Sequence, residues 1–337
     1  MKIRIWMERG GWVAKHAREK AAQLEYEKVE TIAVIRHAAM GDMVLTRPFL
    51  LELRRHFPKA KITLCLVSNY TRGAPEDLVD RVHISYGSDQ KDISLLEQLR
   101  QHKMLGHHDL IFDLASTSRS FWLCLLNPAG LKIGFPYHQI QRRFIYDAAV
   151  LRSDMKFEAE TLLDMLNLLS LKTDYPLRFS MPGISMKRKR PYLVYFTSAS
   201  TADKCWSARR FAELISRLAD KYSDYEHVVL EGVATWESID EVMQGLKDRE
   251  NVTPLQLDSL NETFSLLMGA SLLVSNDTGI RHMAIASETP TVGIFFHTIP
   301  FRYWPRFGKH DAVFNADGSQ PDVDTVMQSV EFIMEEL

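Results

Sequence analysis

Cysteine is scarce in this chain of 337 residues, with three copies that lie far apart at Cys65, Cys124 and Cys205. An odd number of cysteines without CxxC spacing predicts neither a disulfide framework nor a zinc site. We therefore expect reduced thiols that are mostly buried.

Long apolar runs are also missing. The uncharged stretches 263–276 and 289–301 contain polar residues and fall short of the ~20 apolar residues that a membrane span needs. The first nine residues carry four charges where a signal peptide needs an apolar block. With 46% hydrophobic, 25% charged and 10% aromatic residues, the composition is that of packed globular cores. These features predict a soluble protein that stays in the cytoplasm.

Several motifs that would indicate a specific chemistry are absent: GxGxxG, GxxxxGK[ST], HExxH and GxSxG. No motif therefore supports a P-loop enzyme or a hydride-transfer enzyme. His107 and His108 stand beside Asp109, but adjacent loop histidines are usually only polar loop residues. We expect no metal site and no bound cofactor.

The net charge of −2 hides an asymmetry between the two halves of the chain. Residues 1–172 carry 25 basic and 20 acidic groups, which gives +5, whereas residues 173–337 carry 16 and 23, which gives −7. Two interpretations of this asymmetry stay open. It can arise by chance on solvated faces, or the first half can bind an anionic partner.

Apolar periodicity predicts alternating strands and helices in both halves, which is typical of parallel sheets with crossover helices. The predicted strands are 31–36, 61–67, 109–116, 191–197, 226–232, 271–277 and 289–296. The predicted helices are 42–57, 92–102, 207–222, 238–248, 261–270 and one that begins near Ile280. The sequence thus predicts two α/β domains.

Composition shifts suggest the domain boundaries. Residues 1–30 have no strand pattern of the first sheet and are predicted to be an accessory extension, either a packing element or a membrane-surface contact. Residues 31–172 form the first domain, the Pro- and Lys/Arg-rich 173–190 a linker, and 191–320 the second domain. Residues 321–337 have helical periodicity and end the chain as a docked helix.

The turn HAAMGDM after the first strand places Asp42 at the start of a helix. An aspartate there can cap the helix by accepting backbone N–H bonds. A carboxylate at a strand end can also serve as general base towards a hydroxyl nucleophile. From the residues alone the cap is favoured, and the base remains an alternative.

A second polar strand end is SNDTGIRHMAIAS, residues 275–287. The N–H groups of a helix that starts at Thr278–Gly279 could bind a diphosphate, although the same turn could be an ordinary cap and His282 could be packed. Further polar residues end or follow neighbouring strands of this domain, and they can bind phosphate or ribose: Thr197, Ser198, Lys204 and Glu231.

Four segments, in this order, resemble glycosyltransferase family 9, the bacterial lipopolysaccharide heptosyltransferases. They are IAVIRHAAMGDMVLTRPFLLELRRHFP, DLIFDLASTSRS, KCWSARRFAELISRL and LLVSNDTGIRHMAIASETPTVGIFFHTIPFRYWP. The resemblance covers roughly residues 30–310. Its most specific part is DTG-x-x-H-x-A-x-A with a following Thr-Pro strand, paired with the Gly-Asp near the N-terminus.

The resemblance implies a GT-B fold: two Rossmann-like domains with parallel sheets that face each other across an interdomain cleft. The donor would bind in the C-terminal domain and the acceptor in the N-terminal one, with the C-terminal helix packing back towards the latter. It implies Asp42 as the base, Lys204, Thr278 and Gly279 at the diphosphate, and Glu231 at the ribose. Asp277 and His282 would contact the donor sugar or phosphate, with Thr197 and Ser198 in the same site.

The function implied is inverting, metal-independent transfer of heptose from ADP-heptose to a lipid-A-linked inner-core sugar, with contact to the inner membrane and no nucleic acid partner. Transfer of another sugar to a capsule, O-antigen or protein acceptor stays open, as does a non-catalytic nucleotide-sugar-binding protein. Two features depart from the family: the extra N-terminal residues, and Ser207 where relatives often have proline. Candidates for acceptor binding, from charge and position, are Gly41, Arg72, Arg119, Arg142 and Arg143.

Overall fold

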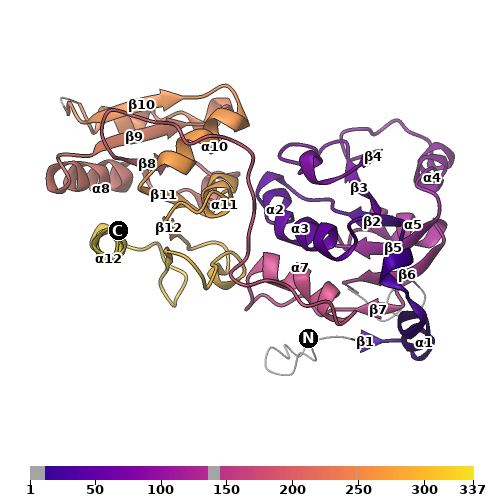
Figure 1. Cartoon of the computed structure of the whole chain (residues 1–337). Helices are drawn as coiled ribbons and strands as arrows, with labels where there is room; N and C mark the ends of the chain where they lie inside the picture. The colour runs from indigo at the N-terminus through magenta and orange to yellow at the C-terminus, as the bar shows by residue number, and fades with distance from the viewer. Residues whose placement is uncertain (1–11, 136–144, 248) are drawn as a thin grey trace. The chain divides into compact units, whose positions relative to one another are not determined.

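The computed structural model describes residues 12–135, 145–247 and 249–337 (Figure 1). The chain divides into two α/β units, Met1–Arg178 and Phe179–Leu337. The division falls inside residues 173–190, the segment predicted as a linker. Within the described part of the chain, no helix is long and apolar enough to cross a membrane.

The N-terminal unit contains a seven-stranded sheet in the order β1-β7-β6-β5-β2-β3-β4. Six of its strands are parallel, and β1 pairs antiparallel with β7 at one edge. The strands are β1 (Trp12–Val13), β2 (Thr31–Ile35), β3 (Lys61–Val67), β4 (Arg81–Ser85), β5 (His108–Asp113), β6 (Ala129–Gly134) and β7 (Ala148–Ala149).

Helices lie on both faces of this sheet (Figure 1), and α3 contacts α7 while α4 contacts α5. The helices are α1 (Lys15–Gln23), α2 (Met40–Val44), α3 (Arg47–His56), α4 (Leu95–Lys103), α5 (Ser118–Leu126) and α7 (Glu158–Asn167), with 3₁₀ turns η2 (Tyr26–Lys28) and η3 (Glu76–Leu78). Because both faces are covered, the strands are continuous apolar runs, as in β2, where residues 32–35 are all buried.

Two expectations for this unit were wrong. We predicted no strand of the first sheet before residue 31, but β1 pairs with β7, and α1 is fixed beside it by His16 and Lys20, both of which contact Asp147 at 2.9 and 3.3 Å. We also predicted one helix over 42–57, whereas α2 ends at Val44 and α3 begins at Arg47. Pro48 lies in the first turn of α3, where its missing N–H costs nothing, and it cannot continue the preceding helix.

The C-terminal unit contains a six-stranded, fully parallel sheet in the order β10-β9-β8-β11-β12-β13. The strands are β8 (Tyr192–Phe196), β9 (Glu226–Glu231), β10 (Val252–Gln256), β11 (Leu272–Asn276), β12 (Thr291–Ile294) and β13 (His310–Val313). The helices are α8 (Ala208–Lys221), α9 (Asp240–Gln244), α10 (Leu260–Gly269), α11 (Gly279–Ala286) and α12 (Val323–Glu335), with 3₁₀ turns η4 (Ala202–Lys204), η5 (Thr235–Glu237) and η6 (Pro300–Arg302).

The last helix packs on the C-terminal unit. We expected it to pack towards the N-terminal domain, but it contacts α8, β12 and β13. Its apolar face is buried in the same core as the inward side of α8, through Val323, Val326, Val330 and Ile333. Because this apolar face is buried within its own domain, it is not available to pack elsewhere, which is the physical reason for the correction.

Candidate active site

The carboxyl ends of β8 and β11 form a topological switch point in the C-terminal domain. These two strands are neighbours, and from them the chain proceeds outward in opposite directions, through β9 and β10 on one side and β12 and β13 on the other. Ligands of open parallel sheets bind at such points. Thr197 and Ser198 follow β8, and Asp277 follows β11. Asn276 Nδ2 joins the two ends by donating to the Thr197 carbonyl at 2.7 Å.

Lys204 is positioned by two residues just after it in the chain, Trp206 and Ser207. Trp206 is buried, its backbone N–H donates to Asn276 Oδ1 at 3.0 Å, and its indole N–H donates to the Pro321 carbonyl at 2.9 Å. Ser207 accepts from Arg210 N–H and caps α8. The segment is therefore fixed to the end of β11, and the Lys204 ammonium lies 3.7 Å from an Asp277 carboxylate oxygen.

The first turn of α11 presents backbone donors beside this lysine. Thr278 is the N-cap residue with extended backbone, its side chain makes no capping bond, and Gly279 is the first helical residue. The N–H groups of such a turn and the helix dipole favour an anion. Asp277 is only 9% exposed, so its charge is balanced locally by Lys204 and by the buried Arg281.

Arg281 holds the start of α11 in place. Its guanidinium donates to the Tyr303 carbonyl at 2.5 Å and lies 5.1 Å from the ring centroid of Phe295, and burial lowers the pKa of Arg281 to about 10. A side chain at residue 293 would collide with it, because a Cβ on Gly293 would lie 2.3 Å from Arg281 Nε. The next residue, His282, is buried with its ring centroid 5.0 Å from that of Tyr303.

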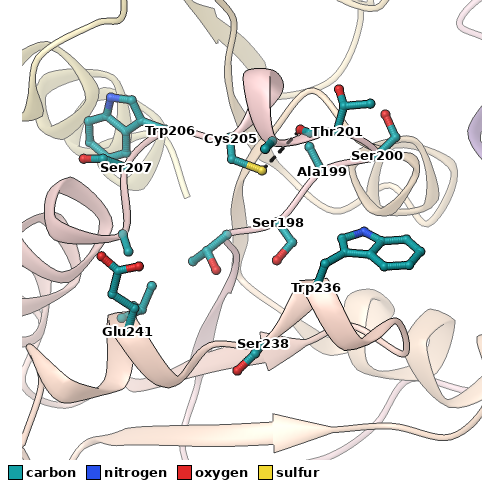
Figure 2. A pocket seen from close by; sticks show the side chains of 14 residues that line it. Ser198, Ala199, Ser200, Thr201, Cys205, Trp206, Ser207, Trp236, Ser238 and Glu241 are labelled. Atoms are coloured by element: carbon teal, nitrogen blue, oxygen red, sulfur yellow. Dashed lines mark hydrogen bonds between the residues drawn. The ribbon is translucent and has the colours of Figure 1, made fainter.

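A pocket of about 480 Å³ opens beside the end of β8 (Figure 2). Thr197 and Ser198 line it, whereas the other predicted donor residues do not: Lys204, Glu231, Asp277, Thr278, Gly279 and His282. Glu231 is the last residue of β9 and is half-buried. Figure 2 shows Trp236 on one side of the pocket, Ser198 in the middle, and Glu241 with Ser207 on the other side.

The sequence analysis missed Trp236 and Glu241. The available signal for Trp236 is a tryptophan in the polar turn that follows β9, and the structure leaves it 72% exposed. Exposed tryptophans are uncommon enough that their position at a pocket rim is informative.

The N-terminal domain has its own switch point, between β2 and β5. Gly41 is buried and Asp42 is partly exposed in the short helix α2 after β2. The cap interpretation of Asp42 was wrong: the N-cap residue is Ala39, and Asp42 lies in the first turn without a capping role. Its carboxylate oxygen Oδ1 accepts no hydrogen bond from the residues the structure describes.

Behind Asp42 lies a buried ionic network that the sequence analysis did not single out. Arg36, the residue that directly follows β2, is 1% exposed and donates to the Leu114 carbonyl at 2.9 Å, the Asp42 carbonyl at 3.1 Å and Glu158 Oε1 at 3.2 Å. It also lies 3.6 Å from Asp42 Oδ1. Glu158, fully buried at the start of α7, receives a second cation from Arg152. This network fixes the backbone that carries Asp42.

His37 and the start of α5 complete this edge. His37 Nδ1 lies 2.9 Å from the hydroxyl of Thr117, which caps α5. Burial, with the positive fields of His102, Arg119 and His83, lowers the pKa of His37 to about 3, so its ring is neutral at pH 7. Arg119 lies in the first turn of α5, beside the Thr117 cap.

Arg72 is exposed in a loop that reaches α2, because a Cβ on Gly73 would lie 2.9 Å from the Met40 side chain. The predicted acceptor residues Arg142 and Arg143 lie outside the described residues.

No group of three histidine, cysteine or acidic side chains suited to a metal ion occurs among the residues described. Asp109 has a structural role, since its carboxylate accepts from the N–H groups of Glu30 and Thr31 at 2.9 Å. All three cysteines are free, with Cys65 and Cys124 buried and Cys205 half-buried. Burial raises the pKa of the Cys65 and Cys124 thiols, which favours their protonated form.

Comparison with known proteins finds lipopolysaccharide heptosyltransferases among the relatives of this chain. The chain is 22% identical over 276 residues to lipopolysaccharide heptosyltransferase 3 of Escherichia coli K12, covering 76% of this chain and 79% of that one. It is 24% identical over 290 residues to lipopolysaccharide heptosyltransferase 1 of Pseudomonas aeruginosa, covering 80% and 79%.

Solved structures show the same fold. Escherichia coli heptosyltransferase WaaC with ADP-2-deoxy-2-fluoro heptose superposes with a TM-score of 0.72 at 19% identity, covering 91% of this chain and all of that one. A family 9 glycosyl transferase from Veillonella parvula gives 0.71 at 18% identity, covering 93% and 99%. The chain therefore has the GT-B fold that the resemblance implied.

The model of glycosyltransferase family 9 (heptosyltransferase) matches residues 94–331. The match includes the predicted donor residues and begins after Asp42. Because it spans more than half of the sequence, the chain belongs to glycosyltransferase family 9, and the protein is a glycosyltransferase.

Proposed function

We propose that this protein transfers a heptose from ADP-heptose to an inner-core sugar of lipopolysaccharide, with inversion at the anomeric carbon. The family match carries the proposal, and the two switch points support it by providing a cationic strand end in one domain and a carboxylate in the other. The relative solved with an ADP-heptose analogue supports ADP-heptose as donor. The acceptor, a lipid-linked sugar, implies work at the cytoplasmic face of the inner membrane.

In this proposal the C-terminal domain holds the donor. The ammonium of Lys204 and the first N–H groups of α11, at Thr278 and Gly279, neutralise the diphosphate as it leaves. Electrostatic groups fixed in advance are the usual source of such stabilisation, and Trp206 fixes this lysine. The remaining donor contacts are assigned to hydroxyl, carboxylate and imidazole groups nearby: Thr197, Ser198, Glu231, Asp277 and His282.

The N-terminal domain holds the acceptor. Asp42 takes the proton of the attacking acceptor hydroxyl while the new bond forms between that oxygen and the anomeric carbon. The bond from the anomeric carbon to the diphosphate breaks with its electron pair, so ADP leaves. Arg72, Arg119, Arg142 and Arg143 are proposed acceptor contacts, because a core sugar next to lipid A is surrounded by anionic groups that guanidinium groups bind well. Gly41, the neighbour of Asp42, is proposed as a further acceptor contact.

Thermal unfolding with added nucleotides tests the donor half of the proposal without any acceptor. A ligand that binds only the native state adds about 2.7 kcal/mol to the free energy of unfolding at 100 times its dissociation constant, and it thereby raises the unfolding midpoint. We expect ADP to raise the midpoint and ADP-heptose to raise it further, with smaller shifts from UDP, GDP, CDP and NAD. A larger shift with another nucleotide would contradict ADP-heptose as the donor.

A further inference from the structure

Helix α4 of the N-terminal domain exposes several large apolar side chains at its two ends. Leu95 and Leu96 in its first turn are 66% and 72% exposed, and Met104 directly after the helix is 68% exposed. An ordinary surface helix of an α/β domain turns such residues to the sheet and its polar residues to water. This arrangement is therefore unexpected from packing alone.

Polar residues on the inward side of α4 form hydrogen bonds, and these bonds fix the orientation of the helix about its own axis. Gln101 spans the edge of β4, accepting from Tyr86 N–H at 2.8 Å and donating to the Ile84 carbonyl at 2.5 Å. His102 is buried, with its Nδ1 3.4 Å from the Ser85 hydroxyl. Turning Leu96 and Met104 towards the sheet would break these contacts and leave buried polar groups without partners, which is costly.

The neighbouring helix α5 adds to the same surface. Trp122 and Leu125 lie on its outer side and are 45% and 51% exposed. The buried Asn127 ties the two helix ends together, because its amide donates to the His102 carbonyl at 2.8 Å and accepts from Gly106 N–H at 2.9 Å. Figure 1 shows α4 and α5 beside each other on the N-terminal domain.

We call Leu95, Leu96, Met104, Trp122 and Leu125 the α4–α5 surface. Cations accompany it on the same two helices. Arg100 and Lys103 are exposed on α4, and Arg119 is half-exposed on α5, against a single partly exposed carboxylate, Glu97. Leucine and tryptophan between arginine and lysine is the composition of helices that lie in the headgroup region of a bilayer. Long cationic side chains can keep their charge at the phosphates while their stems cover apolar surface.

We propose that the α4–α5 surface docks on the anionic phospholipid surface of a membrane, with the leucines and Trp122 in the interfacial layer and the cations at lipid phosphates. The choice of a bilayer as occupant rests on the proposed function, whose acceptor is lipid-linked. The exposure, charge and hydrogen bonding of the surface are independent of that proposed function. The surface would hold the proposed acceptor-binding domain at the membrane.

Vesicle co-sedimentation of the full chain tests the proposal. The probes are vesicles of phosphatidylethanolamine with phosphatidylglycerol, and vesicles of phosphatidylcholine alone. We expect wild type to sediment with the anionic vesicles and at least about tenfold less with the neutral ones. Two separate changes, Leu95→Gln with Leu96→Gln, and Trp122→Gln, should each lower binding at least about tenfold, since glutamine keeps a helix but removes the apolar contact. Arg100→Gln with Lys103→Gln should lower binding to anionic vesicles only.

Phe332→Gln is the matched control, because Phe332 is 58% exposed on a helix of the other domain and should leave vesicle binding unchanged. Wild-type binding of both surface variants, or no sedimentation of wild type, would overturn the proposal. The proposal would also be overturned if light scattering showed a wild-type dimer that either change dissociates, because the surface would then join two copies of the chain. ADP-induced stabilisation, measured on every variant, reports separately on folding and on the proposed function.

Discussion

At the residue scale, the central feature is the way Asp42 is supported. A single buried guanidinium, Arg36, donates to the Asp42 and Leu114 carbonyls and is neutralised by Glu158. The Asp42 backbone is thus held while its carboxylate is partly exposed. A general base needs this combination of fixed position and access to the substrate proton.

Asp42→Asn should lower kcat about 100-fold or more, because the amide keeps the shape and cannot take the proton. The measurement is steady-state transfer with saturating donor and acceptor. ADP-induced stabilisation should match wild type, since the proposed donor contacts lie in the other domain. Retained turnover in this variant would remove Asp42 from the role of base.

Lys204→Ala should weaken ADP-heptose binding about tenfold to 100-fold, because a charge-assisted contact to phosphate contributes roughly 1.5–3 kcal/mol. Isothermal titration gives the dissociation constant directly. Lys189→Ala is the matched control, an exposed lysine that lines a different hollow of the same domain. Equal donor affinity in the two variants would exclude Lys204 from the donor site.

Glu158→Gln should destabilise the protein by about 3–5 kcal/mol, because the buried Arg36 would lose its carboxylate partner. Urea unfolding of the variant beside Glu335→Gln, an exposed position on α12, gives the difference in free energy of unfolding. A cost as small as that of the control would mean that the network does not stabilise the end of β2.

At the scale of elements, α12 shows what a helix pattern does and does not reveal. Its apolar periodicity predicts a docked helix, and Val326, Val330 and Ile333 are indeed buried. Periodicity does not say which surface receives that face. The structure gives the answer, because the face completes the core beneath α8 in its own domain.

Ile333→Ala should therefore cost about 2–5 kcal/mol of stability, whereas Phe332→Ala should stay within about 0.5 kcal/mol. The two residues are neighbours on α12 and differ in burial, at 3% and 58% exposure. Thermal unfolding of both variants compares them. Equal effects of the two substitutions would contradict docking of this face on the C-terminal core.

Most of the central strands could be predicted from the sequence, because a buried parallel strand is a short, mostly apolar run, as in residues 31–35 and 272–276. The unpredicted strands have weaker patterns. β10 contains Pro254, which is tolerated because β10 is an edge strand that pairs only with β9. β4 is an edge strand of the N-terminal sheet, beside α4, and its exposed and buried residues alternate.

The candidate site could be predicted in part, because polar residues after strands mark the edge where ligands bind. Asp277 and Lys204 were predicted in the same site, and the structure brings them within 3.7 Å. The pairing of Arg36 with Glu158 could not be predicted, since it joins residues 122 positions apart. Contacts of that kind depend on tertiary packing and leave no local spacing to detect.

At the scale of the whole molecule, each domain has a sheet whose chain order reverses at one pair of strands, β2 with β5 and β8 with β11. Each pair ends in groups of a different kind: a carboxylate in the N-terminal domain, and a lysine with helix N–H groups in the C-terminal one. This division matches a transfer reaction in which one domain activates a hydroxyl and the other stabilises a diphosphate leaving group.

The most direct test of heptose transfer is a turnover assay with ADP-heptose and lipid-A-linked core acceptors truncated before and after the first heptose. Mass spectrometry of the acceptor and NMR of the new anomeric centre report the product and its configuration. We predict that one acceptor gains a single heptose with inverted configuration, and that Asp42→Asn abolishes this gain. Release of ADP without a glycosylated acceptor, or a product with retained configuration, would contradict the account.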